Sequence, residues 1–244
     1  MKTHLLALTA LCALALSPVA GLAAESGSVA HAMADPARPA SDRKLDAVRK
    51  PAAALAFSGI KPGATVAEYL PGGGYYTRML SDIVGPTGKI YALETSTWGK
   101  ENVENTKKAL ANLHNVTMDV TPLGQFKVPE KVDVFWTTDN YHDLHVPKYA
   151  NVDMAAFNKA VFDALKAGGT YIIVDHAAAA GTGAKDSPTL HRIEKKTVID
   201  EVTAAGFKLA GESDALHRTS DDHTRKVFDL HYSTDQFILR FRKP

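Results

Sequence analysis

The stretch Ala64-Thr-Val-Ala-Glu-Tyr-Leu-Pro-Gly-Gly-Gly-Tyr-Tyr-Thr-Arg-Met-Leu80 decides the fold of this chain. A short β-branched run ends in the acid Glu68, and a run of three glycines follows at residues 72–74. Apolar residues then recur at helical spacing as far as Ile83, which predicts an amphipathic helix. A strand, a glycine turn and a helix in this order bring the backbone close to a nucleoside-like ligand.

A second acid lies at the corresponding place in the next expected strand. Residues 89–94 form a short apolar run that ends in Glu94, twenty residues after Gly74. An acid at the tip of the second strand is placed to accept hydrogen bonds from a ribose. The two features together indicate a nucleoside cofactor, although three glycines can also form a simple tight turn and Glu94 can be a solvated strand end. Thr77 stands where a dinucleotide fingerprint needs glycine or alanine, and no phosphate-binding loop sequence is present.

The N-terminal residues are typical of an export signal. Lys2 precedes an apolar run over residues 5–16, and small residues follow at 20, 21, 23 and 24. We therefore expect a signal peptide at 1–24, a flexible leader rich in small residues at 25–41, and one domain at 42–244. The protein is then periplasmic or secreted, with no stable membrane insertion after cleavage. The only cysteine, Cys12, lies in the apolar run, so the mature chain has no thiol for catalysis or metal binding.

Charge and periodicity narrow the class of protein. The 28 basic and 27 acidic residues nearly balance, without the basic patch that drives nucleic-acid binding. Short strand patterns alternate with helical ones from residue 64 onwards, and residues 237–241 alternate as a final strand. This predicts an α/β fold, a Rossmann-like, doubly wound, seven-stranded and mostly parallel sheet with an antiparallel last strand. The sequence gives no indication of the oligomeric state.

Several landmarks in order resemble class I S-adenosylmethionine-dependent methyltransferases. They are the acid and glycine turn described above, Glu94, Asp133-Val-Phe, and Leu165-Lys-Ala-Gly-Gly-Thr-Tyr-Ile-Ile-Val-Asp175. The resemblance covers roughly residues 42–244. Residues 71–77 and 234–243 are more narrowly similar to a group of secreted, predicted methyltransferases of unassigned substrate. The resemblance implies an exported transferase that uses S-adenosyl-L-methionine and acts on an unidentified, small-molecule acceptor.

The resemblance also implies a cofactor site. It assigns cofactor binding to Glu68, Gly72, Gly73, Gly74, Glu94 and Asn140. The chain departs from the family pattern at Leu70, where a glycine is usual. It also lacks the acid that often contacts adenine after the third strand, where it reads Val120-Thr-Pro122. These departures favour an alternative, a non-catalytic exported ligand-binding or assembly protein on a methyltransferase fold.

The catalytic candidates are His142 and Asp143, which follow a buried strand in a polar stretch at residues 138–144. A neutral imidazole suits removal of a proton from an acceptor, and Asp139 or Asp143 could orient the ring. A loop histidine without a catalytic role is the competing interpretation. Asp175 and His176 end the next strand and face the same edge, so convergence there would allow a catalytic or metal site.

The histidines raise the question of a metal, and we expect none to be bound. No pair has a recognised ligand spacing, which favours scattered surface histidines. Residues 177–187 and 213–233 are each predicted to be either a cover over the site or a plain connector. The histidines considered are His142, His145, His176, His191, His217, His223 and His231.

Overall fold

The computed structural model describes residues 28–244. The signal peptide expected at 1–24 and the first residues of the expected leader lie outside this range. The helices are α1 (Val29–Ala34), α2 (Ala40–Arg49), α3 (Pro51–Ser58), α4 (Tyr75–Val84), α5 (Lys100–Leu110), α6 (Met154–Ala164), α7 (Ser187–Leu190), α8 (Lys195–Ala204) and the 3₁₀ turns η1 (His142–His145) and η2 (Val227–Leu230). The strands are β1 (Thr65–Tyr69), β2 (Lys89–Thr95), β3 (Val116–Thr121), β4 (Val132–Thr138), β5 (Leu165–His176), β6 (Lys208–Ser213) and β7 (Gln236–Arg242).

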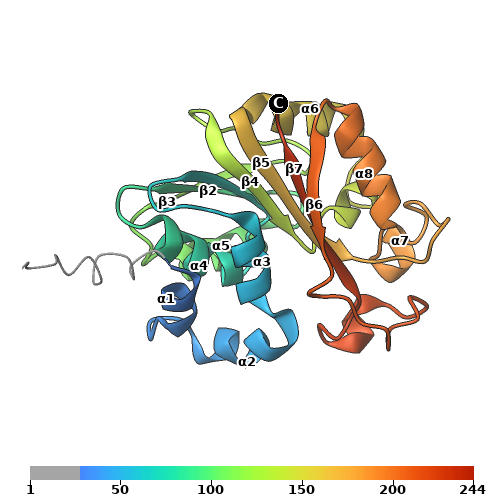
Figure 1. Cartoon of the computed structure of the whole chain (residues 1–244), viewed down its shortest axis with the longest axis horizontal. Helices are drawn as coiled ribbons and strands as arrows, with labels where there is room; N and C mark the ends of the chain where they lie inside the picture. The colour runs from blue at the N-terminus through green and yellow to red at the C-terminus, as the bar shows by residue number, and fades with distance from the viewer. Residues whose placement is uncertain (1–27) are drawn as a thin grey trace, which may run out of the picture.

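The seven strands form one sheet in the order β3-β2-β1-β4-β5-β7-β6 (Figure 1). Neighbours from β3 to β5 pair in parallel, and β7 is antiparallel to both β5 and β6. The predicted sheet, with its antiparallel last strand, is therefore confirmed. Strand order reverses between β1 and β4, which is where open α/β sheets hold ligands at the carboxyl ends of their strands.

Alternating residues of the central strands face two separate cores. Val66, Val134 and Ile172 pack with residues of α1, α3 and α4 on one face. Ala67 and Phe135 pack with residues of α6 and α8 on the other. This period-two alternation buries both sides of the sheet, as the near-continuous apolar runs of these strands require.

The expectation of a flexible leader is wrong for residues 28–41. Ser28 caps α1 by accepting a hydrogen bond from the backbone of His31, and Ala32 is fully buried in the core beside α4. Arg38 is also buried and pairs with Asp46 at 2.6 Å. Alanine-rich composition indicated a linker, but small residues are also what allows a short helix to pack closely on another.

Two element boundaries bear on the site. β5 begins at Leu165, so Gly168 and Gly169 lie inside the strand. α8 begins only at Lys195. His191 instead has a left-handed backbone, with φ of +56°, at the end of the short helix α7.

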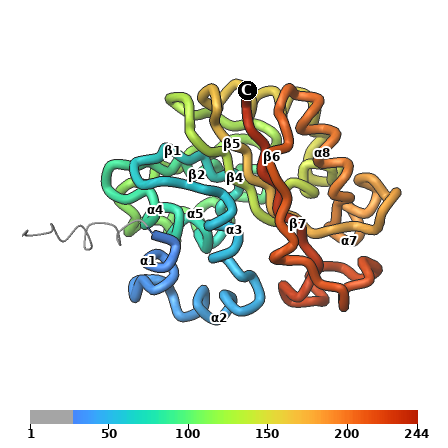
Figure 2. The backbone as a smooth tube through the Cα atoms, in the orientation of Figure 1, coloured from blue at the N-terminus to red at the C-terminus, as the bar shows by residue number. Residues whose placement is uncertain are grey.

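Two segments far apart in sequence cover the carboxyl ends of the strands. α2 and the long connection between β6 and β7 both extend below the sheet in the view of Figure 1, and the tube in Figure 2 follows each chain path. They touch: Lys50 Nζ donates to the carbonyl oxygen of Ala215 at 3.0 Å, and Arg218 donates to that of Val48 at 2.5 Å. The chain thus encloses the edge of the sheet where a ligand is expected.

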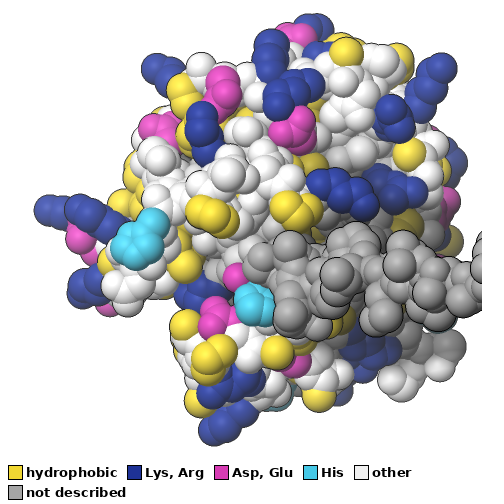
Figure 3. Space-filling model, turned by 60° about the vertical axis from the view of Figure 1, so that its left-hand side comes forward, with side chains coloured by type: hydrophobic (Ala, Val, Ile, Leu, Met, Phe, Trp, Pro, Cys, Tyr) yellow, Lys and Arg dark blue, Asp and Glu magenta, His cyan; other side chains and the backbone are white. Residues whose placement is uncertain are grey.

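The surface agrees with the balanced charge of the sequence. On the face seen in Figure 3, lysine and arginine side chains are spread out and lie among acidic ones. Among residues 28–244, no helix has the length and apolar character needed to cross a membrane.

Trp136 on β4 gives a test of this packing. Its side chain is fully buried, its ring centroid lies 5.2 Å from that of Tyr76, and its indole N–H donates to Thr138 at 2.7 Å. We expect Trp136→Ala to lower the free energy of unfolding by about 3–5 kcal/mol in urea titrations. Phe228→Ala is the control, because that ring is 65% exposed and its loss should change stability by no more than about 0.5 kcal/mol. Equal effects from the two variants would contradict the packing described.

Candidate functional site at the carboxyl ends of the strands

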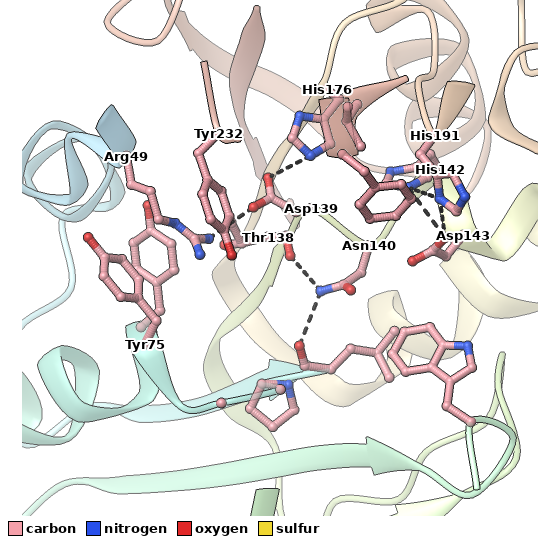
Figure 4. Close-up of a pocket in the computed structure, with 18 of the residues that line it drawn as sticks. Arg49, Tyr75, Thr138, Asp139, Asn140, His142, Asp143, His176, His191 and Tyr232 are labelled. Atoms are coloured by element: carbon pink, nitrogen blue, oxygen red, sulfur yellow. Dashed lines mark hydrogen bonds and ion pairs between the residues drawn. The ribbon is translucent and has the colours of Figure 1, made fainter. Parts of the chain in front are cut away.

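A pocket of about 500 Å³ opens at the carboxyl ends of β1, β4 and β5 (Figure 4). Its size suits a small-molecule or cofactor ligand. The turn after β1, the loop after β4 and the end of β5 form its inner wall. α2, the start of α4, Trp98, Tyr149 and the η2 region form the rest.

The turn after β1 keeps a glycine-like backbone at Leu70. Its φ is +59°, a left-handed conformation that costs an L-residue roughly 1–2 kcal/mol. Gly72 and Gly74 in the same turn have φ of +53° and +75°. The departure from the family pattern at Leu70 therefore changes the side chain and leaves the local backbone path in the conformation that glycine favours.

Glu68 supplies the buried acid of the pocket. The side chain is 3% exposed, and its Oε2 atom has no hydrogen-bond partner. Burial raises the pKa of its carboxyl group to about 7. A buried carboxylate without a donor is costly, so the site is poised to gain from a cationic ligand group.

The other predicted cofactor residues divide into two sets. Gly72, Gly73 and Asn140 line the pocket with Glu68. The Nδ2 group of Asn140 donates to the carbonyl oxygen of Leu70 at 3.1 Å, which ties the β4 loop to the glycine turn. Gly74 does not line the pocket; a Cβ atom there would lie 2.7 Å from Leu110, so this glycine allows α5 to pack.

The expectation that Glu94 lines the same pocket is wrong. Its carboxylate accepts hydrogen bonds from the backbone N–H of Thr95 and the hydroxyl of Thr106, each at 2.7 Å. It is 1% exposed and is not among the residues that line the pocket. The sequence located the strand end correctly, but it gave no sign that α5 supplies Thr106 to satisfy this acid.

His142 lies in the pocket wall, oriented by a residue other than those predicted. Its Nδ1 atom is 2.7 Å from Oδ1 of Asp175, and its backbone N–H donates to the other oxygen of Asp175 at 2.8 Å. The sequence had given this orienting role to Asp139 or Asp143. Asp175 takes it because β5 is the neighbour of β4, and both strands end at the same edge.

Asp143 and His191 complete the surroundings of His142. Burial alone would lower the pKa of His142, but the charges of Asp175 and Asp143 raise it to about 10. Burial alone would raise the pKa of Asp143, but the adjacent imidazoles lower it to about 2. Without a bound cation, the His142 ring thus carries a proton at neutral pH, which makes it a poor general base.

The sequence interpretation missed Arg49, which closes one end of the pocket. Its guanidinium donates to Asp139 at 2.9 Å and lies over the rings of Tyr75 and Tyr232, 4.4 and 5.0 Å from their centroids (Figure 4). Arg49 comes from a helix 90 residues before Asp139, and nothing in the local sequence pattern predicts that pairing.

The two candidate covers have different positions. Val227, Phe228, His231 and Tyr232 line the pocket, so the connection between β6 and β7 covers it. No residue of the 177–187 loop does so; Ala177, Ala178 and Ala180 line a separate cavity.

Backbone strain concentrates around the pocket. Seven non-glycine residues in the described range 28–244 have positive φ, and five of them line the pocket. Such strain persists where the surrounding structure enforces it, and it clusters at ligand sites. The five are Leu70, Asp139, His191, His231 and Tyr232.

Solved structures with a similar fold are methyltransferases and related proteins. A SAM-dependent methyltransferase from Aquifex aeolicus aligns with a TM-score of 0.59 and 21% identity over 85% of this chain and 99% of its own. Aeropyrum pernix fibrillarin, solved with natively bound S-adenosyl-L-methionine, aligns with a TM-score of 0.53 and 19% identity over 81% and 76%. The [4+2]-cyclase SpnF aligns with a TM-score of 0.57 and 16% identity over 84% and 81%.

No family model and no curated protein matches the sequence at a significant level. The structural likeness establishes the fold, which is that of class I methyltransferases. The activity has to be argued from the pocket.

The buried acid predicts an unusual dependence of stability on pH. The pKa of Glu68 is about 7 in the folded protein and 4.5 in the unfolded chain. Between these pH values the folded state therefore binds a proton that the unfolded state has lost. The free energy of unfolding is therefore highest below about pH 4.5, and it falls by about 3 kcal/mol as the pH rises from there through about 7. We expect ligand-free Glu68→Gln to match the parent at low pH and to exceed its stability at pH 8 by about this amount. Parallel unfolding curves at all pH values would contradict a buried, uncompensated carboxylate.

Proposed function

We propose that this protein is an S-adenosylmethionine-dependent methyltransferase. The observation that carries the proposal is the buried carboxylate of Glu68 beside the glycine turn, whose Oε2 atom has no partner, in a pocket large enough for a cofactor. S-adenosylmethionine carries an ammonium group and a sulfonium group. Either positive charge would relieve the cost of burying this acid.

The residues present fit such a cofactor at three points. Glu68 would hold the ammonium group, and the backbone of Gly72 and Gly73 would lie along the cofactor, since Gly72 faces open space. Trp98 lines the pocket after β2 and offers an aromatic face on which a purine can stack. When bound, the cofactor supplies an electrophilic methyl group.

The acceptor in this proposal is a small molecule. The pocket is enclosed by α2 and the η2 region, whose Phe228 and Tyr232 give it an aromatic rim. Methyl transfer needs chiefly proximity and in-line orientation, which an enclosed site supplies without a strong base. The charged and apolar pattern of residues 1–24 supports an exported enzyme.

One observation favours the alternative of a non-catalytic binding protein. Glu94, the expected ribose acid, uses both oxygens within the protein. The [4+2]-cyclase with a similar fold is a reminder that methyl transfer does not follow from the fold alone. Binding of S-adenosylmethionine without turnover of any methyl acceptor would support this alternative.

Calorimetric titration with S-adenosylmethionine tests the proposed role of Glu68. We expect Glu68→Gln to weaken binding by about 10- to 100-fold, because a charge-assisted contact is lost. Affinity of the parent protein should rise from about pH 5.5 to about pH 7.5, as Glu68 loses its proton, and this rise should vanish in the variant.

Glu94→Gln is the matched control for that titration. It changes an acid at the neighbouring strand end that does not line the pocket, so affinity should change little. If the parent does not bind S-adenosylmethionine at about 1 mM, the proposal is wrong. If Glu94→Gln weakens binding and Glu68→Gln does not, the cofactor lies elsewhere.

Gly72→Val tests the approach of the glycine turn to the cofactor. Its φ of +53° strains any side chain, and a Cβ atom there would meet no protein atom within 4 Å, so the valine would project into open space beside the pocket. We expect cofactor binding to be abolished in a protein that still folds. Gly59→Val is the control, because Gly59 has φ of +70° and equally open surroundings but lies outside the pocket. Equal cofactor affinity in the two variants would reject this role for Gly72.

A further inference from the structure

Three side-chain atoms converge at the end of the pocket formed by η1 and α7. Nε2 of His142 lies 3.2 Å from Nδ1 of His191 and 3.3 Å from Oδ1 of Asp143. Nδ1 of His191 lies 3.3 Å from the same Asp143 oxygen. The three atoms therefore form a nearly equilateral triangle, and all three residues line the pocket (Figure 4).

This triangle has the dimensions of one face of a metal coordination sphere. Ligand atoms about 2.1 Å from an ion lie about 3.4 Å apart in tetrahedral geometry and about 3.0 Å apart in octahedral geometry. We propose that His142, Asp143 and His191 bind a divalent first-row transition metal ion, with its remaining coordination positions open to the pocket.

The unused oxygen of Asp143 supports a cation at this point. Oδ1 is buried and lies 3.3 Å from two ring nitrogens, yet it accepts a hydrogen bond from neither. The two ring nitrogens are instead within hydrogen-bond distance of each other, and a cation bound by all three groups would replace that contact. A buried carboxylate atom without a partner calls for an ion or a water molecule.

A second carboxylate prepares His142 as a ligand. Asp175 is fully buried, and its oxygen can only accept from Nδ1 of His142 at 2.7 Å. The proton is therefore on Nδ1, and the lone pair of a neutral ring is on Nε2, which faces the triangle. A carboxylate, a histidine and a metal in this relation are the usual outer-shell support of a protein metal site.

The ligand set selects the class of ion. Two imidazoles and one carboxylate suit Zn²⁺, Fe²⁺ and their neighbours, whereas Mg²⁺ and Ca²⁺ prefer oxygen ligands. Three protein ligands with open positions are typical of sites where the metal also binds a reacting molecule. Such an ion would hold an acceptor's oxygen or nitrogen atom in the pocket.

A nearby cluster of Asp139, Asp175 and His176 is less suited to a metal. The oxygens of Asp139 accept from Arg49 and Gln236, at 2.9 and 2.5 Å. Those of Asp175 accept from His142 and from the backbone of His176. Protein donors already occupy these carboxylates, so a cation there would have to break existing bonds.

Metal binding can be tested without any cofactor. The full chain is stripped with a chelator and titrated with Co²⁺, followed by its visible absorption, and then with Zn²⁺ in competition with a chromophoric chelator. We expect one equivalent to bind and Mg²⁺ not to compete. Asp143→Asn and His191→Ala should each weaken binding by about 100-fold or more, and Asp175→Asn by about 10- to 100-fold.

Two controls make the result specific. His231→Ala removes a histidine that lines the same pocket but lies outside the triangle, and Asp139→Asn disables the other cluster. His231→Ala should keep the parent's Co²⁺ affinity, and Asp139→Asn should weaken it far less than Asp143→Asn does. Circular dichroism checks that each variant is folded. Because His191 is only partly buried, His191→Ala should disturb folding less than substitution of the buried Asp143.

The proposal is overturned if the parent binds neither Co²⁺ nor Zn²⁺ saturably, because the triangle is then only a cluster of polar side chains in the pocket wall. It is also overturned if Asp139→Asn abolishes binding while Asp143→Asn does not. S-adenosylmethionine titration of Glu68→Gln reports on a different part of the pocket, beside the glycine turn. Failure of the metal site and failure of the methyltransferase proposal are therefore distinguishable.

Discussion

The ion pair between Arg49, whose side chain is largely buried, and Asp139 is the interaction on which the closed pocket depends. It joins α2 to Asp139 at the end of β4, and its flat face packs against tyrosines from α4 and from the segment before β7. Asp139 has a left-handed backbone, which stays in place because Arg49 and Gln236 hold its two oxygens. Four parts of the chain meet at this one charge. Without it, the partly buried carboxylate of Asp139 would lose its arginine partner, and α2 would lose its side-chain contact with the end of β4.

Local sequence pattern was sufficient for the sheet, because each strand and each helix has its own periodicity. It was also sufficient for residues at or just beyond the carboxyl ends of strands, such as Glu68 and Asn140, since parallel strands end at a common edge. It failed where the partner is remote. The hydroxyl of Thr106 donates to Glu94, and Asp175 orients His142. His191, which is 49 residues from His142 in the sequence, contacts its ring. Those contacts depend on how α5, β5 and α7 pack, and no short-range spacing encodes them.

Leu70 shows how a departure from a motif can leave its geometry unchanged. The turn after β1 keeps the positive φ that glycine would adopt freely, although leucine carries a strain of about 1–2 kcal/mol there. The leucine side chain is buried in the core beside Tyr69 and Tyr141. Burial of an aliphatic side chain is worth about as much as the strain costs. The fold can therefore impose the conformation, and the motif is satisfied by backbone shape rather than by residue type.

The electrostatics of the pocket explain why one site would take two different cations. Among the described residues that line the pocket, Glu68, Asp139 and Asp143 are acidic and Arg49 alone is an arginine or lysine, while the carboxylate of Asp175 is buried directly behind His142. In the ligand-free protein the imbalance is relieved by protons, held on Glu68 near neutral pH and on His142 well above it. A sulfonium cofactor beside Glu68 would replace its proton with a fixed charge and so relieve a desolvation cost that the folded chain already carries. A metal ion at the other end has to displace the proton that Asp175 and Asp143 hold on His142, so its affinity should rise with pH.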